Sequence, residues 1–532
     1  MLNKFKSILL VFFSLSLLWS CQKDLELKPE DNRSSADKAF QDPAAYKQFL
    51  AKLYAGLAVS GQDGPAGNPD LEGLDEGFSQ YMRLYFMMQE LPTDEAVIGW
   101  NDGTIKDLHA QNWTSGNEFI RTMYSRLLYQ VALTNEFLRQ TTTDKLDSRG
   151  VSSEEQSKIE EYRYEARFLR ALSYYHAMDL FGNPPFITED DPIGAFLPEQ
   201  IQRADLFNYI ESELLDIEGK ITPAGQNEYA RADQGAVWML LSKLYLNAEV
   251  YTGTPRYADV ITYTEKVINS GQYELVDDYQ KLFLADNNTN GAQKEIIFPI
   301  AFDGLNTQSY GGMTFIIHAA VGGNMEPADF GVSSGWAGLR TTPVLVDQFP
   351  DGADSEDSRA LFFTDGQSKE IKDISSFTDG YAVTKYKNVD VNGNQGSDTS
   401  GEFPDTDFPM FRLGDAYLMY AEAYVRGGGG SEAKAVEYIN KLRERAYGNS
   451  SRNISGNDLD LDFILSARAR ELYWEAQRRT DLIRFNQFSE NGIWPFKGGV
   501  PQGATTAAYR NLMPIPASDL GVNTNLTQNP GY

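Results

Sequence analysis

The chain has 532 residues and carries 47 Lys and Arg against 75 Asp and Glu, a formal net charge of −28. So acidic a surface repels nucleic acid and anionic lipid, and the sequence shows no basic cluster that would bind either. The single cysteine excludes an intramolecular disulfide and a zinc site made of cysteines. The length is sufficient for a large core, and we expect one compact globular unit.

The first residues have the pattern of an export signal. A basic start precedes an apolar run over residues 8–18, which is too short to span a bilayer, and Cys21 follows directly. This cysteine resembles the acceptor of a bacterial lipoprotein, which predicts cleavage of residues 1–20 and a lipid on Cys21. The alternative is an ordinary signal peptide with an incidental cysteine. Residues 21–36 then form a lipidated tether, and its start (QKDLE, 22–26) resembles the signal that places Bacteroidetes lipoproteins on the outer face of the outer membrane.

Residues 37–285 are predicted to form an N-terminal helical part. Apolar residues recur with a spacing near 3.6, and Gly- or Pro-rich breaks separate neighbouring helices. Three helix pairs are expected, two in this part and one further on: 162–180 with 204–217, 233–249 with 257–269, and 411–425 with 431–446. Helix–turn–helix units of this length resemble tetratricopeptide repeats, although the period is irregular.

The C-terminal part, residues 286–532, begins with a loop-rich insert over 286–410. Gly, Asn, Ser and Asp become more frequent there and helical periodicity fades. Residues 295–300 are predicted to form a short strand, and 390–402 a loop. Such irregular segments usually carry the recognition surface of a protein.

No catalytic or metal-binding constellation is apparent. His109, His176 and His318 are isolated, and no nucleophile elbow, phosphate-binding loop or dinucleotide fingerprint occurs. The loop 390–401 begins like a calcium loop but lacks the central Gly and the final Glu that such a loop requires. We therefore expect no metal, no cofactor and no catalytic residue. Carboxylates are so abundant that a glycosidase pair stays open on counting alone.

Five segments in order resemble the SusD/RagB family of surface lipoproteins. They are EARFLRAL (165–172) with LFG (180–182), RADQGAVWMLLSKLY (231–245) with VINSG (267–271), RLGDAYLMYAEA (412–423), REL (470–472) with RTDLIR (479–484), and PIP (514–516) with NLTQNPGY (525–532). The resemblance implies a mainly α fold with four tetratricopeptide-like helix pairs as scaffold, and a loop-rich region with short strands that carries the ligand site. It also implies a lid on a SusC-like TonB-dependent transporter that captures oligosaccharides or, in RagB-like members, peptides.

The shared segments are mostly scaffold. Arg167, Arg170, Arg479 and Arg484 are expected to pair with acidic side chains between helices rather than to touch a ligand. The motifs therefore indicate the family and leave the ligand open.

A neutral sugar is bound by an aromatic ring under its C–H face and by planar polar groups at its hydroxyls. The best match is Trp100, followed by Asn101 and Asp102 in a Gly-Trp-Asn-Asp-Gly turn. Family members carry a glycan-stacking aromatic in similar loops. The alternative is a Trp that folds back onto the scaffold. On the first interpretation, truncation of Trp100 weakens binding and leaves thermal stability nearly intact.

Further candidates lie in the loop-rich insert and just before the Trp100 turn. Trp336 stands among glycines that can expose its ring, and Tyr310 lies in a second loop. Arg83, Asn324 and Asp329 are candidate hydroxyl partners. Three other tryptophans lie on helical patterns and are predicted to be core residues: Trp113, Trp238 and Trp474.

The sequence thus favours a cell-surface glycan-binding lipoprotein of the outer membrane, and not an enzyme. It would hand oligosaccharides to a SusC-like transporter. Two alternatives remain at this point: capture of peptides, as in RagB-like members, and a surface glycosidase.

Overall fold

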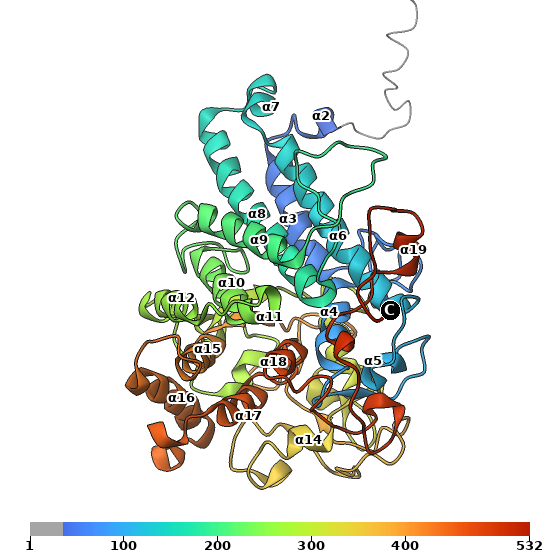
Figure 1. Cartoon of the computed structure of the whole chain (residues 1–532), viewed down its shortest axis with the longest axis vertical. Coiled ribbons are helices and arrows are strands. Elements are labelled where there is room, and N and C mark those ends of the chain that lie inside the picture. Colours follow the sequence, from blue (N-terminus) through green and yellow to red (C-terminus); the bar gives the residue numbers. More distant parts are fainter. Residues whose placement is uncertain (1–35) are drawn as a thin grey trace, which may run out of the picture.

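The computed structural model describes residues 36–532, and the fold is mainly helical (Figure 1). Cleavage after residue 20, the lipid on Cys21 and nearly all of the tether lie outside these residues and stay predictions. Within the described part, no helix is long and apolar enough to cross a membrane.

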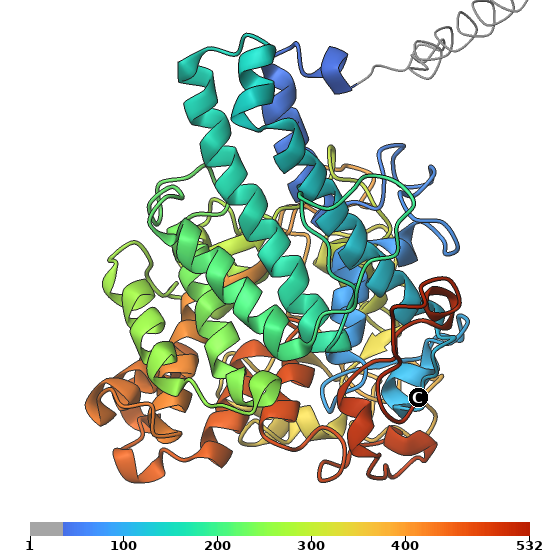
Figure 2. The same cartoon turned by 45° about the horizontal axis from the view of Figure 1, so that its top comes forward.

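Two long helices, α6 (Glu118–Gln140) and α8 (Ser153–Phe181), pack side by side and project at one end of the molecule (Figure 2). Helix α3 (Ala44–Ala58) packs against both, and α4 (Tyr81–Glu90) lies against α6. The sequence predicted only 162–180 of α8. The helix begins earlier because the Ser152 side chain caps it, accepting from the backbone N–H of Glu155 at 3.3 Å.

The remaining predicted helices are present. They are α9 (Arg203–Glu218), α10 (Gln234–Leu246), α12 (Tyr257–Asn269), α15 (Leu413–Val425) and α16 (Glu432–Tyr447). The packing continues from α8 to α9, from α10 to α12, and from α12 through α15 to α16. The mainly α fold is therefore confirmed, whereas the tetratricopeptide geometry of the pairs stays a prediction.

Two predicted boundaries were wrong. Helix α10 ends at Leu246, and a separate short helix, α11 (Ala248–Thr252), follows it. The segment expected to open a helix at residue 411 is the end of strand β6 (Phe408–Arg412), which pairs antiparallel with β2 (Ile296–Ile300). Both strands are fully buried, so their sequences are continuous apolar runs that periodicity cannot separate from a buried helix.

The loop-rich insert also holds a helix that the sequence did not indicate, α13 (Gly312–Ala319). Every residue of α13 is buried, so it has no polar face and no amphipathic signature. Short elements complete the described chain: α2 (Ala36–Ala39), β1 (Val97–Ile98), α5 (Lys106–Ala110), α7 (Thr143–Ser148), β3 (Leu339–Arg340), α14 (Pro343–Val346), β4 (Phe362–Phe363), β5 (Ala382–Val383), α17 (Leu461–Leu472), α18 (Arg478–Arg484) and α19 (Ala517–Leu520).

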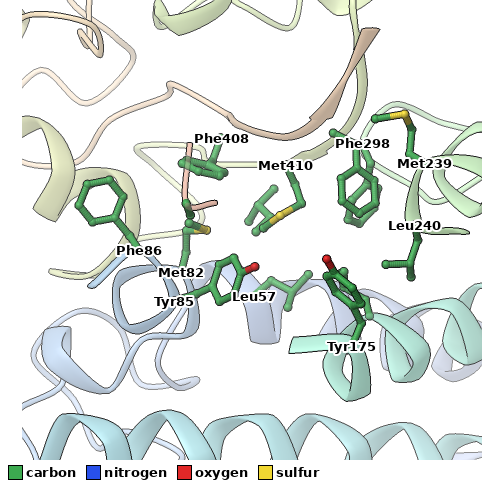
Figure 3. Packing of buried hydrophobic residues seen from close by; sticks show 14 of the residues in the cluster. Leu57, Met82, Tyr85, Phe86, Tyr175, Met239, Leu240, Phe298, Phe408 and Met410 are labelled. Carbon is green, nitrogen blue, oxygen red and sulfur yellow. The ribbon is translucent and has the colours of Figure 1, made fainter. Parts of the chain in front are cut away.

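The hydrophobic core joins the N-terminal helices to the C-terminal strands. All ten residues of α4 are buried, and its Met82 and Tyr85 lie close to Phe408 and Met410 of β6 (Figure 3). Tyr175 of α8 borders the same cluster. Because one cluster includes side chains from both parts of the chain, the two parts share a single core.

The four predicted scaffold arginines pair with acids as expected. Arg167 and Arg170 of α8 both bind Glu213 of α9, each with an N–O distance of 2.8 Å. Arg479 binds Asp179 at 2.7 Å, and Arg484 binds Glu422 at 2.6 Å. These ion pairs hold helices to one another, which confirms their structural role.

Trp113 and Trp474 are fully buried, as predicted for core residues, but neither lies in a helix as the sequence pattern predicted. Trp238 is only half-buried, and its indole N–H donates to Glu218 at 2.8 Å. Trp238 packs against the core but is not fully buried, so the prediction of a core residue is only partly correct.

Candidate functional site

The short ribbon formed by β1 and β3 brings two distant loops together. Val97 pairs with Arg340 and Ile98 with Leu339 in antiparallel register. The pairing extends by one further bond, from the N–H of Gly99 to the carbonyl of Gly338 at 3.0 Å. The loop after β1 carries Trp100 and the loop before β3 carries Trp336, so the register of this ribbon sets the two indoles side by side.

Three predicted aromatic rings converge at this place. The ring centroids of Trp100 and Trp336 are 6.2 Å apart, with planes at 44°. Those of Trp336 and Tyr310 are 6.5 Å apart, with planes at 48°. All three side chains are half-buried, so part of each remains open to solvent. The rings therefore form one cluster of tilted aromatic faces, which we call the aromatic arc.

Trp100 is held more firmly than the sequence suggested. Its indole N–H donates to the carbonyl of Trp336 at 3.1 Å, and its ring meets Phe315 of α13 edge-on at 5.8 Å. A Cβ on Gly338 would come within 2.5 Å of the indole, so only glycine permits this approach. Trp100 thus belongs both to the surface and to the packing beneath it, and its truncation should cost stability, contrary to the expectation from sequence.

His318 lies beneath Trp336 and was dismissed by the sequence as an isolated histidine. Its ring stacks on the indole with a centroid distance of 4.7 Å and an angle of 27°. Its Nδ1 lies 2.7 Å from the carbonyl oxygen of Ser334 and its Nε2 lies 3.0 Å from that of Glu402. Burial lowers the pKa of His318, while the two carbonyl oxygens and the Glu402 carboxylate oppose the shift. No spacing in the sequence links residues 318, 336 and 402, so only the fold reveals this contact.

Arg83 of α4 lies near both Trp100 and Tyr310 of the arc. Its guanidinium lies 3.7 Å from the centroid of the Phe78 ring and 4.2 Å from that of Phe315, and it donates to the carbonyl of Tyr310 at 3.2 Å. Burial lowers the pKa of Arg83 to about 9, and nearby carboxylates, including Asp102, partly offset the effect. The group stays cationic at neutral pH, and cation–π contacts hold it among the rings.

The other predicted polar residues divide into two groups. Asn101 and Asp102 are exposed directly beside Trp100, and within residues 36–532 their side chains have no hydrogen-bond partner. Asn324 and Asp329 are also exposed, but their partners belong to other loops. Asn324 donates to Asp365 at 3.2 Å, and Asp329 stabilises the charge of Lys387.

The side chains of the arc are suited to a ligand that has many hydroxyl groups and an apolar face. Aromatic faces can cover C–H groups, while exposed amide and carboxylate groups can bond hydroxyls. In the described part of the chain, no three His, Cys, Asp or Glu side chains are grouped so that they could hold a metal ion.

Comparison with known proteins identifies relatives of the chain. A model of the SusD family matches residues 359–532. The Starch-binding protein SusD of Bacteroides thetaiotaomicron is 36% identical, and the alignment covers 96% of each chain. SusD-like protein P2 of Formosa agariphila is 27% identical over 74% of this chain and 78% of its own.

Solved structures share the fold. Surface glycan-binding protein A from Bacteroides fluxus superposes with a TM-score of 0.69 at 20% identity, covering 92% of this chain and 99% of its own. The protein of the same name from Bacteroides thetaiotaomicron, in complex with laminarihexaose, gives a TM-score of 0.69 at 18% identity over 91% and 99%. One of these relatives is named for binding starch, and the two structures are named for binding surface glycans. From the identity and coverage shared with the starch-binding relative, the chain belongs to the SusD family.

Proposed function

We propose that the protein binds oligosaccharides at the aromatic arc. The observation that carries this proposal is the convergence of Trp100, Trp336 and Tyr310 from three separate loops into one half-open surface. Asn101 and Asp102 are placed to bond sugar hydroxyls beside it, and Arg83 supports the rings. Three half-open rings gathered on one surface leave apolar area that a ligand can cover.

The first ligand to test is a starch-type α-glucan. The relative that is 36% identical over nearly the whole chain is named for binding starch. Successive ring planes in the arc tilt by 44° and 48°, so the rings do not form a flat platform. An α-1,4-linked glucan is a curved chain and fits such a surface better than a straight one.

Anchoring and delivery form the second half of the proposal. The cysteine after the export segment would carry the lipid that holds the protein on the outside of the outer membrane. The family resemblance supports a SusC-like TonB-dependent transporter as the partner that receives the oligosaccharide. A detergent pull-down of the native lipoprotein that recovers no such transporter would contradict this half, as would membrane attachment that survives Cys21→Ala.

Calorimetric titration tests the binding half. Maltohexaose is the expected ligand, laminarihexaose is the control of equal length and different linkage, and a mixed hexapeptide pool tests the RagB-like alternative. Trp336→Ala should weaken saccharide binding, whereas Trp238→Ala, at a half-buried Trp on α10, should not. Binding of peptide alone, or saccharide affinity indifferent to Trp336, would overturn the assignment.

A further inference from the structure

A hollow lies on the surface of α3, and its elements differ from those of the aromatic arc. Its volume is about 250 Å³, and the chain between α9 and α10 forms its other wall. Residues that line it and that bear on its chemistry are Lys47, Leu50, Tyr54, Glu228, Tyr229 and Arg231. Leu50 is buried and the two tyrosines flank it, so the hollow combines an apolar floor with a charged rim.

Tyr229 combines an exposed ring with a buried hydroxyl. The residue is 42% exposed, yet its hydroxyl donates to the carboxylate of Asp407 at 2.7 Å. Asp407 is 1% exposed and accepts a second bond from the backbone N–H of Phe302 at 2.8 Å. A tyrosine tied at its tip to a buried group cannot rotate freely, so its ring is presented in a fixed position.

The backbone around Tyr229 is also held in an unusual state. Ala230 has a φ of 64°, in the left-handed region that residues with a Cβ rarely adopt. The backbone N–H of Ala232 donates to the Tyr54 hydroxyl at 2.9 Å, and that hydroxyl donates to Glu165 at 2.6 Å. Backbone states of this kind persist only where the surroundings enforce them, and they cluster at ligand sites.

Charged groups at the rim stand within reach of a ligand above the ring. The Glu228 carboxylate accepts from Lys47 at 2.8 and 3.0 Å and from Arg231 at 2.9 Å, and it remains largely exposed. A carboxylate and an ammonium group side by side can bond adjacent hydroxyls as acceptor and donor.

We propose that this hollow is a second saccharide-binding site, which takes one or two sugar units of a glycan. Tyr229 stacks on the sugar ring, and Glu228 with Lys47 bonds its hydroxyls. The class of ligand rests on the proposed function of the arc, while the site itself rests on the fixed ring and the hollow. Two sites on one protein raise the effective concentration of a polysaccharide at the second once the first is occupied.

The test separates the two sites by mutation. Ligand-observed saturation-transfer NMR with maltotriose is recorded on the full chain, on Trp100→Ala, and on Trp100→Ala combined with a second change. We expect residual binding in Trp100→Ala, a loss of about tenfold or more when Tyr229→Ala is added, and retention when Tyr229→Phe is added, because phenylalanine keeps the ring. Tyr257→Ala is the matched control. Tyr257 of α12 is a half-buried tyrosine whose hydroxyl donates to Glu249 at 2.6 Å.

Several outcomes would overturn the second site. In one outcome, the unmodified chain binds maltotriose and Trp100→Ala does not, although its melting curve shows that it is folded. This result would leave the proposed function intact. Residual binding that survives Tyr229→Ala is another. A protein in which neither change alters binding, or which binds no saccharide at all, contradicts the proposed function itself, and the second site falls with it.

Discussion

The aromatic arc and the charged cluster around Arg412 are two regions of one molecule that differ in burial and in the partners of their charged groups. Arg412 is fully buried and binds Glu295, Glu471 and Glu475 at 3.0, 2.6 and 2.7 Å. The arc is half-open, and its one buried cation, Arg83, has no ion pair in the described chain and rests among rings instead.

The difference shows what each region is for. In the charged cluster Arg412 and its three carboxylate partners bond to one another and to other protein groups, so they are not available to a ligand, and the cluster joins β6 to α17. At the arc, ring faces and the exposed Asn101 and Asp102 remain available. Buried polar groups that bond to one another serve the scaffold, whereas the exposed groups beside the arc are free to bond a ligand.

The largest effect is expected from Arg412→Met. The change removes one buried cation that three buried carboxylates share, which costs about 3–5 kcal/mol of the free energy of unfolding. Chemical denaturation measures this loss, and saccharide binding should disappear only where the protein unfolds. A variant of native stability would show that the cluster does not hold the scaffold.

Acid should remove the stability that this cluster provides. The pKa of Glu471 is held well below its usual range by Arg445, Arg412 and Arg359, against the opposing effect of burial. A carboxyl whose pKa is lower in the folded state adds stability above its unfolded pKa, and this stability is lost as the pH falls toward the folded value. The free energy of unfolding should therefore decline steadily below about pH 4.5, the ordinary range of a glutamate. A flat profile there would contradict the assignment.

Trp100→Ala is expected to affect both binding and stability. Loss of the stacked ring should weaken oligosaccharide binding by about 1–3 kcal/mol, roughly 5- to 150-fold. Because the ring also packs on Phe315, the free energy of unfolding should fall by about 1–2 kcal/mol, less than for a fully buried Trp. Titration calorimetry and melting on one sample measure both quantities. Lost stability with unchanged affinity would mean that the ring is scaffold alone.

His318→Phe sharpens the comparison, because His318 belongs to the arc but is not expected to touch the ligand. Phenylalanine keeps the stack under Trp336 and removes both contacts to carbonyl oxygens. We expect affinity to fall by about 1 kcal/mol as the ring loosens, together with a change in tryptophan fluorescence on saccharide binding. His318→Asn, which keeps a donor, should restore part of the affinity. An unchanged binding signal in His318→Phe would remove His318 as a positioning residue.

The smallest effects separate the exposed polar candidates. Asn101→Ala should reduce affinity by about 0.5–1.5 kcal/mol, the net worth of one hydrogen bond. Asn324→Ala should leave affinity unchanged, since Asn324 bonds Asp365 rather than a group of the arc. Neither change should alter the melting temperature. A larger loss of affinity in Asn324→Ala than in Asn101→Ala would place the ligand near Asn324 instead of Asn101.

Residues with a local signal were predicted correctly from the sequence. Amphipathic periodicity and Gly–Pro breaks located the six predicted helices, and the apolar run at 295–300 located β2. The scaffold arginines were assigned correctly because their motifs are shared across the family. The all-buried α13 and the β6 strand escaped, because an apolar run without periodicity does not tell a helix from a strand.

The sequence by itself determined the helical class, the family, and the residue types that could bind a sugar. It named Trp100, Trp336 and Tyr310 separately, with no means of knowing that they meet. Only the tertiary structure decided that, through the two-residue ribbon of β1 and β3, the close approach at Gly338, and the stack on His318. The reason is physical: helices are set by neighbours three and four positions away, whereas this surface depends on contacts between positions 236 apart in the chain.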